Sequence, residues 1–411
     1  YMKGDHKYIT FFTLFILVVT STIIMVSADH ILLFFCAWCA SNLLLTKLMG
    51  YKPNWQAARA SASLAAKNHL ITAVCIGSGL LYFYFGSQST SIQTIVHSKM
   101  QSSYLLPGLA LLIVGAAAQS AVYPFHKWLM SSLNSPTPVS ALMHAGLINA
   151  GGYLLARFAP LYIQLPEVLD VIFVVGIASA FLGTAWKLIQ SDIKRSLACS
   201  TMGQMGFMLA QCGLGLFAAA VTHVVWHGLF KAYLFLSSSS AAQERRYSPK
   251  QPPTALTFAC ALFCGALASY GMALGSGKPL LNLDTSLMLF VIALLAGTQT
   301  ALPLLARRPI GSLLRAVSIT GSISYLYGLS IQLISGVLLP MNITHPQPLN
   351  LWHMVAIAML VVGWLWMVFT KTTLSSDTPP KWFLKIYAAA LDASQPHPST
   401  VTTHRNSYTY K

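Results

Sequence analysis

The sequence predicts an all-α polytopic membrane protein, and three observations support this interpretation. Of its 411 residues, 55% are hydrophobic and only 8% are charged. A soluble globular domain carries about 25% charged residues, so this chain lacks the residues needed for a surface that faces water. Its long apolar runs are continuous rather than alternating, which excludes a closed β-barrel. The same observations exclude a soluble enzyme, a secreted disulfide scaffold and a disordered protein.

Twelve apolar runs are long enough to cross a bilayer as helices, which takes about 20 residues. Charged residues or Pro- and Gly-rich segments separate these runs from one another. The predicted spans are 8–28, 30–49, 69–86, 104–121, 138–158, 167–190, 195–215, 217–240, 254–275, 285–305, 312–339 and 350–370.

The basic residues predict the orientation of these spans. Nearly all of the 25 Lys and Arg residues fall on the side that holds residue 1, whereas Lys99, Arg157 and Lys278 fall on the other side. By the positive-inside rule the first side is cytoplasmic, so we expect a cytoplasmic C-terminus. The net charge of +16 therefore reflects topology and attraction to anionic lipid, and nucleic acid is not an expected partner.

One predicted span carries three ionisable residues on a single face. His223, His227 and Lys231 are spaced four residues apart, so their side chains stack along one side of a helix. Ionisable groups at membrane depth are costly unless they face a wet or protein-lined interior, so this stripe predicts a hydrated proton relay. Two alternatives stay open: histidines that donate to helix carbonyls, and a zinc site on the His-x-x-x-His pair, for which no third ligand is evident.

The segment 115–144 predicts a broken helix. Pro124 follows an apolar run and removes a backbone donor, and Pro136 and Pro138 open the next helix. Broken helices at membrane depth mark ion and substrate sites in transporters. A re-entrant or interfacial loop fits the same residues.

Three ordered motifs resemble a known family. They are PFHKWL with SPTPVSALMHAG and GGYLLAR in 124–157, SDIKRSLACSTMGQMGF in 191–207 and THVVWHGLFKAYLFL in 222–236. These motifs resemble the proton-antiporter-like membrane subunits of respiratory complex I and of Mrp-type cation antiporters, over residues 1–240.

This resemblance implies an antiporter-like helical bundle with two inverted repeats, each holding one broken helix. The first break would fall at Tyr123-Pro124 and the second within Ser269–Lys278. It also implies further spans upstream of Tyr1. We therefore expect an antiporter-like transmembrane core at 1–240, the remaining transmembrane helices at 241–370 and a cytoplasmic C-terminal tail at 371–411.

The resemblance also implies which residues form the ion pathway. The Glu that the family places after the Trp of the second span is replaced by Cys39, and its Lys on the first broken helix is replaced by Gln119. Both members of a charged pair are thus absent, and we expect downhill conduction rather than pumping. The expected pathway residues are Gln119, His144, Lys194, His223, His227 and Lys231.

Within this superfamily, HAGLINAGGYLLARFAPL and PFHKWL look most like the membrane subunit of DAB-type inorganic carbon pumps. That resemblance implies a subunit of a bacterial inner membrane that conducts H+ or Na+. The current would drive a large cytoplasmic partner of the DabA type, which is carbonic-anhydrase-like and binds zinc. The polar end at 392–411 suits the docking of such a partner.

The zinc would belong to the partner, because no ligand set is evident in this chain, and we expect no cofactor, metal or catalytic site in it. Two other functions remain open. One is a proton-pumping subunit of an NADH-quinone oxidoreductase or an Mrp-type cation/proton antiporter. The other is a scaffold that conducts nothing.

Overall fold

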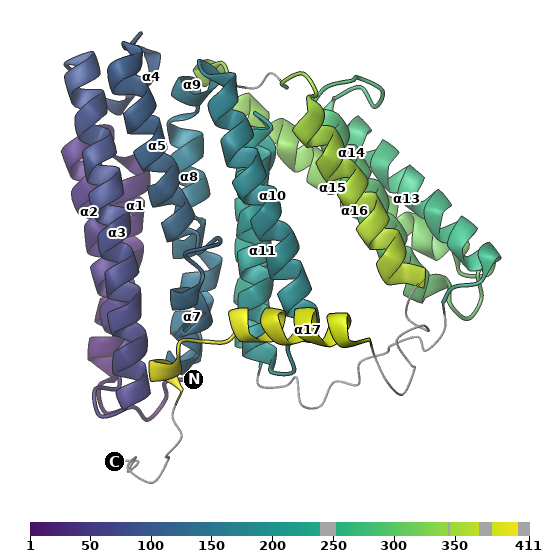
Figure 1. Cartoon of the computed structure of the whole chain (residues 1–411), viewed down its shortest axis with the longest axis horizontal. Helices are drawn as coiled ribbons and strands as arrows, with labels where there is room; N and C mark the ends of the chain where they lie inside the picture. Colours follow the sequence, from purple (N-terminus) through teal and green to yellow (C-terminus); the bar gives the residue numbers. More distant parts are fainter. Residues whose placement is uncertain (239–251, 344–345, 370–379, 402–411) are drawn as a thin grey trace. The chain divides into compact units, whose positions relative to one another are not determined.

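A computed structural model describes residues 1–238, 252–343, 346–369 and 380–401 of the chain (Figure 1). Within these ranges the regular elements are helices, and ten helical segments are long and apolar enough to cross a membrane. The predicted fold class, an all-α polytopic membrane protein, is confirmed.

The described residues form two compact units. One holds residues 1–213, 223–238 and 387–401, and the other holds 214–222, 252–343, 346–369 and 380–386. The first eleven helices are α1 (Tyr8–Ser27), α2 (Ile31–Met49), α3 (Gln56–Ser87), α4 (Ile92–His97), α5 (Ser102–Gln119), α6 (Lys127–Met130), α7 (Thr137–Ala145), α8 (Ala150–Arg157), α9 (Ala159–Ile163), α10 (Pro166–Ile189) and α11 (Ile193–Gly213). They are followed by α12 (Phe217–Leu236), α13 (Ala255–Ser276), α14 (Ser286–Leu305), α15 (Leu313–Leu338), α16 (Leu351–Phe369) and α17 (Lys381–Ala393).

Two of the twelve predicted spans differ in composition from the rest. They form α11 and α12, which are not among the ten membrane-crossing segments that length and composition identify. α11 begins with Lys194 and Arg195, and α12 carries the ionisable stripe. At 21 and 20 residues, both still reach about 30 Å, the thickness of a hydrocarbon core.

The third helix is longer than its predicted span, 69–86. α3 begins at Gln56 and runs for 32 residues, because its first part is rich in helix-forming Ala but interrupted by polar residues. A hydropathy criterion detects the apolar part alone, so the prediction missed this extension.

The chain is interrupted twice where the sequence predicts one break. α5 ends at Gln119, before Pro124, which agrees with a broken helix in this segment. The next predicted span, 138–158, is itself divided into α7 and α8 by a 3-10 turn at Leu147–Asn149. Figure 1 shows α7 and α8 following one another in a single column.

The second predicted break is wrong. α13 is continuous across most of Ser269–Lys278 and ends at Ser276, where Gly277 takes a left-handed conformation with φ of 65°. The Gly-rich sequence of this segment therefore terminates a helix, which is a common use of glycine, rather than breaking it.

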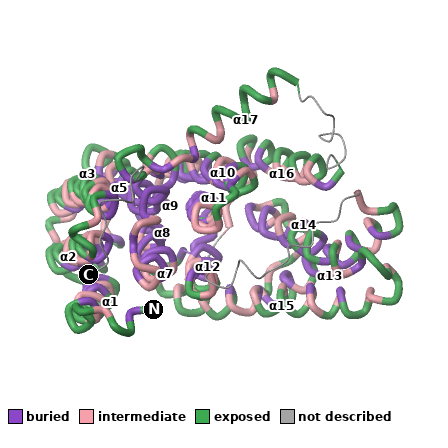
Figure 2. Tube along the Cα trace, turned by 90° about the horizontal axis from the view of Figure 1, so that it is seen from below, coloured by how far each residue is buried: buried purple, intermediate pink, exposed green. Residues whose placement is uncertain are grey.

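α10 and α11 pack closely because small residues line their contact. A Cβ atom on Gly183 would collide with the backbone of Gly203, and one on Gly206 would collide with that of Ala180. Small residues at such interfaces let helix backbones approach each other in membranes. Figure 2 shows that buried residues are concentrated on α7, α8, α9 and α11 within this unit.

The predicted polar tail contains a helix and a segment that folds back on the first unit. Residues 393–401, called the strap below, begin at the last residue of α17. Its partners lie on the α5–α7 link and around the α10–α11 connection. The contacts are His126 Nε2 to Ala393 O at 3.2 Å, Lys127 Nζ to Ala393 O at 3.1 Å, Gln190 Nε2 to Ser394 Oγ at 2.8 Å, Arg195 NH1 to Gln395 Oε1 at 2.9 Å, His397 N to Ser131 Oγ at 2.9 Å and Asn134 Nδ2 to Thr400 O at 2.9 Å. Of the tail predicted to dock a partner, 402–411 lies outside the described residues.

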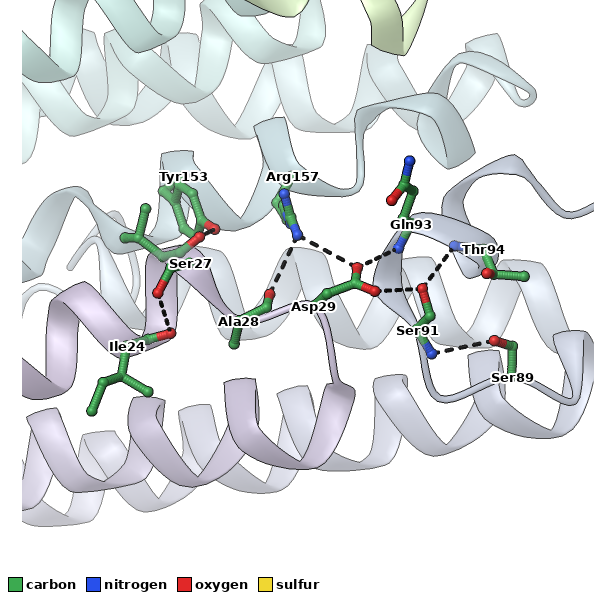
Figure 3. Close-up of polar contacts among 11 residues, drawn as sticks. Ile24, Ser27, Ala28, Asp29, Ser89, Ser91, Gln93, Thr94, Tyr153 and Arg157 are labelled. Atoms are coloured by element: carbon green, nitrogen blue, oxygen red, sulfur yellow. Dashed lines mark hydrogen bonds and ion pairs between the residues drawn. The ribbon is translucent and has the colours of Figure 1, made fainter.

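A carboxylate joins the α1–α2 connection to α4 and α8 (Figure 3). Asp29 accepts hydrogen bonds from the Ser91 hydroxyl at 2.5 Å and from the Gln93 backbone N–H at 2.8 Å. Arg157 lies 3.8 Å from the same carboxylate and donates to Ala28 O at 3.3 Å. The Ser91 hydrogen bond, with the smaller contributions of Gln93 and Arg157, lowers the pKa of Asp29 below its usual 3.8.

Replacing this carboxylate tests its structural role. In Asp29→Asn the hydrogen bonds lose their charge assistance, so we expect a lower melting temperature at pH 7. Because folding lowers the pKa of Asp29, its contribution is present at neutral pH and is lost as the pH falls through that lowered pKa. The difference in melting temperature between wild type and variant should therefore shrink below about pH 4. An equal difference at both pH values would contradict the assignment.

Candidate functional site

The interrupted helices are held by side chains at the end of α5. Gln119, the last residue of α5, donates from Nε2 to Leu147 O at 3.1 Å, and the Ser120 hydroxyl donates to Ile148 O at 2.9 Å. Asn149 donates from Nδ2 to Ala145 O at 2.6 Å. A break in a helix frees carbonyl groups that need donors. Ser120 and Asn149 supply donors here, and Gln119 adds a second one to Leu147 O, which also accepts from the Ala150 backbone N–H.

Gln119 also forms a reciprocal pair with a residue of α2. The amide groups of Gln119 and Asn42 donate to each other, each over 3.1 Å, and both residues are buried. The position that the family resemblance singles out on α2, Cys39, is half-buried. Asn42, one helical turn further on, makes the contact to Gln119 instead.

The predicted stripe on α12 is buried along one face of the helix. His223, His227 and Lys231 are all buried, and the side chain of Lys231 is 0% exposed. The two imidazole rings lie nearly parallel, with ring centroids 5.8 Å apart. Lys231 Nζ donates to Leu197 O on α11 over 3.2 Å.

Thr201 joins His144 to the same backbone carbonyl. His144 Nδ1 lies 3.0 Å from the Thr201 hydroxyl, which donates to Leu197 O at 3.0 Å. Leu197 O therefore accepts from both Thr201 and Lys231, so one carbonyl links α7, α11 and α12. The ring of His144 also stacks on Phe235, with ring centres 4.2 Å apart. The structure thus brings together four of the predicted pathway residues, of which His144 comes from a different helix.

Four ring nitrogens of this cluster have no hydrogen-bond partner within the described residues. They are His144 Nε2, His223 Nε2 and both nitrogens of His227. Buried polar atoms in proteins nearly always have a partner, either protein or ordered water. Within the described residues, the ammonium group of Lys231 donates to a backbone carbonyl, Leu197 O, and not to a carboxylate. Such groups at membrane depth are typical of functional sites.

Two predicted residues lie apart from this cluster. Lys194 stands in the first turn of α11 and is partly exposed. Gln119 belongs to the amide pair with Asn42 and donates to Leu147 O rather than to the stripe on α12. Of the predicted helix-breaking prolines, Pro124 lies between α5 and α6, while Pro136 and Pro138 flank the first residue of α7.

Sequence reasoning missed several residues that the structure places in these networks, among them Asn42, His69 and Thr201. Asn42 pairs with Gln119, and its backbone carbonyl accepts a hydrogen bond from Thr46, whose hydroxyl lies 3.1 Å from His69 Nδ1. Thr201 links His144 to α11. A polar residue inside an apolar run was the available signal for Asn42, whereas His69 stands at the start of its predicted span, directly after Lys67 and Asn68. Thr201 lies in a helix with many polar residues and gave no such signal.

In the part of the chain that the structure describes, no group of three or more His, Cys, Asp or Glu side chains can hold a metal ion. The His-x-x-x-His pair on α12 therefore has no third ligand of these types there. Its two rings stack on each other instead of converging on one point.

These features define a class: a multi-pass helical membrane protein with an interrupted helix pair and a buried row of ionisable side chains. The chain belongs to the NADH:quinone oxidoreductase/Mrp antiporter transmembrane family, whose sequence profile matches residues 28–305. The resemblance to proton-antiporter-like subunits is confirmed.

Several curated relatives match part of this chain. It is 39% identical over 254 residues to the probable inorganic carbon transporter subunit DabB1 of Halothiobacillus neapolitanus, covering 60% of this chain and 45% of the relative. It is 35% identical to the corresponding DabB subunit of Bacillus subtilis, over 61% of this chain and 50% of the relative. It is 33% identical to the chloroplastic NAD(P)H-quinone oxidoreductase subunit 5 of Mutisia acuminata, over 61% of this chain and 36% of that subunit. The chain thus spans half or less of the length of these relatives.

Two solved structures share the fold. The Mrp complex from Dietzia matches with a TM-score of 0.53 and 21% identity, over 93% of this chain and 41% of that chain. The membrane-bound sulfane sulfur reductase, an archaeal respiratory membrane complex, matches with a TM-score of 0.51 and 17% identity, over 93% of this chain and 75% of that chain.

The amide pair yields a test of which α2 position faces α5. Asn42→Asp or Gln119→Lys alone buries an unpaired charge, which costs about 3–5 kcal/mol, so we expect each single variant to lower the yield of folded protein. The two changes together can form an ion pair where the amides now meet, and the yield should recover. Folded yield in detergent is measured by size-exclusion chromatography.

The matched control places the acid one turn earlier. Cys39→Glu combined with Gln119→Lys should recover less yield, because Asn42 makes the contact to Gln119. Better recovery with the Cys39 pair than with the Asn42 pair would show that Cys39 is the neighbour of Gln119.

Proposed function

We propose that this chain is the membrane subunit of an energy-coupled uptake complex for inorganic carbon, CO2 or bicarbonate. In this proposal it conducts H+ or Na+ down its gradient. The current drives a large cytoplasmic partner of the DabA type, a carbonic-anhydrase-like protein that holds the zinc. The chain lies in a bacterial inner membrane with its C-terminus in the cytoplasm.

One observation carries the conduction part of this proposal: the buried cluster on α7, α11 and α12. His223, His227 and Lys231 follow one another along α12, and Lys231 shares Leu197 O with the Thr201–His144 pair. Imidazoles exchange protons near neutral pH, and four ring nitrogens of this cluster have no hydrogen-bond partner among the described residues. A pure anchor would not need these costly groups inside a membrane.

Two observations support the carbon part and the downhill direction. The relatives named as probable inorganic carbon transporter subunits match at 35–39% identity. The Gln119–Asn42 pair is uncharged where the resemblance implies a charged switch, so this site stores no energy by separating an ion pair. We therefore propose passive conduction that the partner controls.

Replacing the buried lysine tests the relay. Lys231→Met keeps most of the side-chain volume and removes the ionisable group, so the fold should survive. Inorganic carbon uptake by cells that express the whole complex should fall at least about tenfold, since positioned proton-transfer groups contribute factors of this size or more. The exposed Lys99→Met is the control and should leave uptake unchanged. Undiminished uptake in Lys231→Met at normal expression would favour structural histidines.

Co-purification distinguishes this proposal from its main alternatives. From native membranes in mild detergent, the full-length chain should carry a large zinc-containing cytoplasmic protein. Metal analysis and mass spectrometry of the complex provide the measurement. Flavin and iron–sulfur proteins in its place would identify a proton-pumping subunit of an NADH-quinone oxidoreductase, to which the 33% identical chloroplastic subunits point. A set of small membrane subunits alone would identify an Mrp-type cation/proton antiporter.

A further inference from the structure

A half-open cavity of about 200 Å³ lies in the first unit, where the interrupted helices meet α1 and α2. Its wall includes Trp38 and Ser41 of α2, Gln119 at the end of α5 and Asn149 in the turn between α7 and α8. Val224 of α12 also lines it. The cavity touches the segments that follow His144 and His223, so its contents lie beside the proposed relay.

The lining is unsuited to an ion. None of the thirteen described residues that line the cavity carries a charge at neutral pH, and the phenol of Tyr153 already donates to Val26 O at 2.9 Å. Of the side-chain oxygens, Gln119 Oε1 is taken by Asn42. A desolvated cation or anion without a countercharge is costly in such a place, so both Na+ and bicarbonate are disfavoured.

The lining does suit a small uncharged molecule. Apolar side chains such as Met25, Leu147 and Val224 form much of the wall. Two buried polar atoms at this wall have no hydrogen-bond partner within the described residues, the donor Trp38 Nε1 and the acceptor Asn149 Oδ1. Apolar walls with a few convergent polar groups are typical of small-molecule sites.

We propose that this cavity binds CO2. The proposal rests on the function proposed above, which limits the substrate to inorganic carbon, and among the inorganic carbon species CO2 alone carries no charge. Its oxygens accept hydrogen bonds, and the indole N–H of Trp38 supplies a donor. CO2 in this position lies beside α7 and α12, the helices that carry His144 and the ionisable stripe.

A matched pair of variants tests the cavity. Val224 lines it, whereas the next residue, Val225, is 51% exposed and does not. Val224→Phe fills part of the cavity, and Val225→Phe adds the same side chain outside it. Ala150→Leu, which also fills the cavity, is the second variant if Val224→Phe does not fold. The purified full-length chain is equilibrated with CO2, and the antisymmetric stretch of CO2 is recorded by infrared spectroscopy.

We expect wild type and Val225→Phe to show a CO2 band distinct from that of CO2 dissolved in detergent, and the cavity-filling variants to lose it. A band that persists in Val224→Phe and Ala150→Leu, or that is absent from wild type, would overturn the proposal. The infrared band is read without any transport assay, so it decides the cavity assignment separately from the proposed function.

Uptake by cells that express the whole complex adds the second readout. With CO2 supplied, Val224→Phe should lower the initial rate at least about fivefold, while cation conduction and Val225→Phe stay at the wild-type level. A parallel loss of cation conduction would make the cavity part of the ion path and overturn its assignment to CO2. Unchanged CO2 uptake in Val224→Phe would exclude it as a substrate site. No inorganic carbon uptake by the wild-type complex would instead refute the proposed function.

Discussion

An interrupted helix inside a membrane leaves carbonyl groups that must find donors, and in this protein three side chains meet that need. Gln119 and Ser120 reach from the end of α5 to the turn between α7 and α8, and Asn149 donates within that turn. The turn between α7 and α8 therefore depends on the end of α5, because Gln119 and Ser120 donate to its carbonyl groups. Since water cannot replace such donors in hydrocarbon, these hydrogen bonds fix how α5, α7 and α8 pack. The position of His144 and the cavity both follow from it.

Charge is distributed unevenly around this interruption. On the side of α2 and α5, the contact is a reciprocal amide pair between Asn42 and Gln119, which holds its geometry without a net charge. On the side of α11 and α12, Lys231 and Thr201 share one backbone carbonyl beside three buried imidazoles. An amide pair cannot take up and release protons as imidazole does, so the two sides suit different tasks. The first holds a neutral cavity, and the second suits proton movement.

The strap, residues 393–401, contacts both the link that follows α5 and the start of α11. His126 and Lys127 of the α5–α7 link both reach Ala393 O, while Gln190 and Arg195 hold the residues that follow it. A segment from the far end of the chain therefore ties the link after α5 to the start of α11. Because Thr201 and Leu197 lie on α11, this tie supports the spacing between His144 and Lys231.

The fold class and the buried stripe on α12 were determined by the sequence, because both depend on local order. Continuous apolar runs set the number and position of most helices, and a four-residue spacing places His223, His227 and Lys231 on one face whatever surrounds them. Local sequence pattern failed to predict features that depend on which residue of a neighbouring helix a side chain contacts. It missed the turn between α7 and α8. The break in α13 that the family resemblance implied is also absent, because the Gly-rich segment there ends a helix. The turn between α7 and α8, the Asn42–Gln119 pair and the Thr201–His144 contact join residues 28 to 77 positions apart. Only tertiary packing decided them, because a buried polar group selects its partner from whatever the neighbouring helices present at its depth.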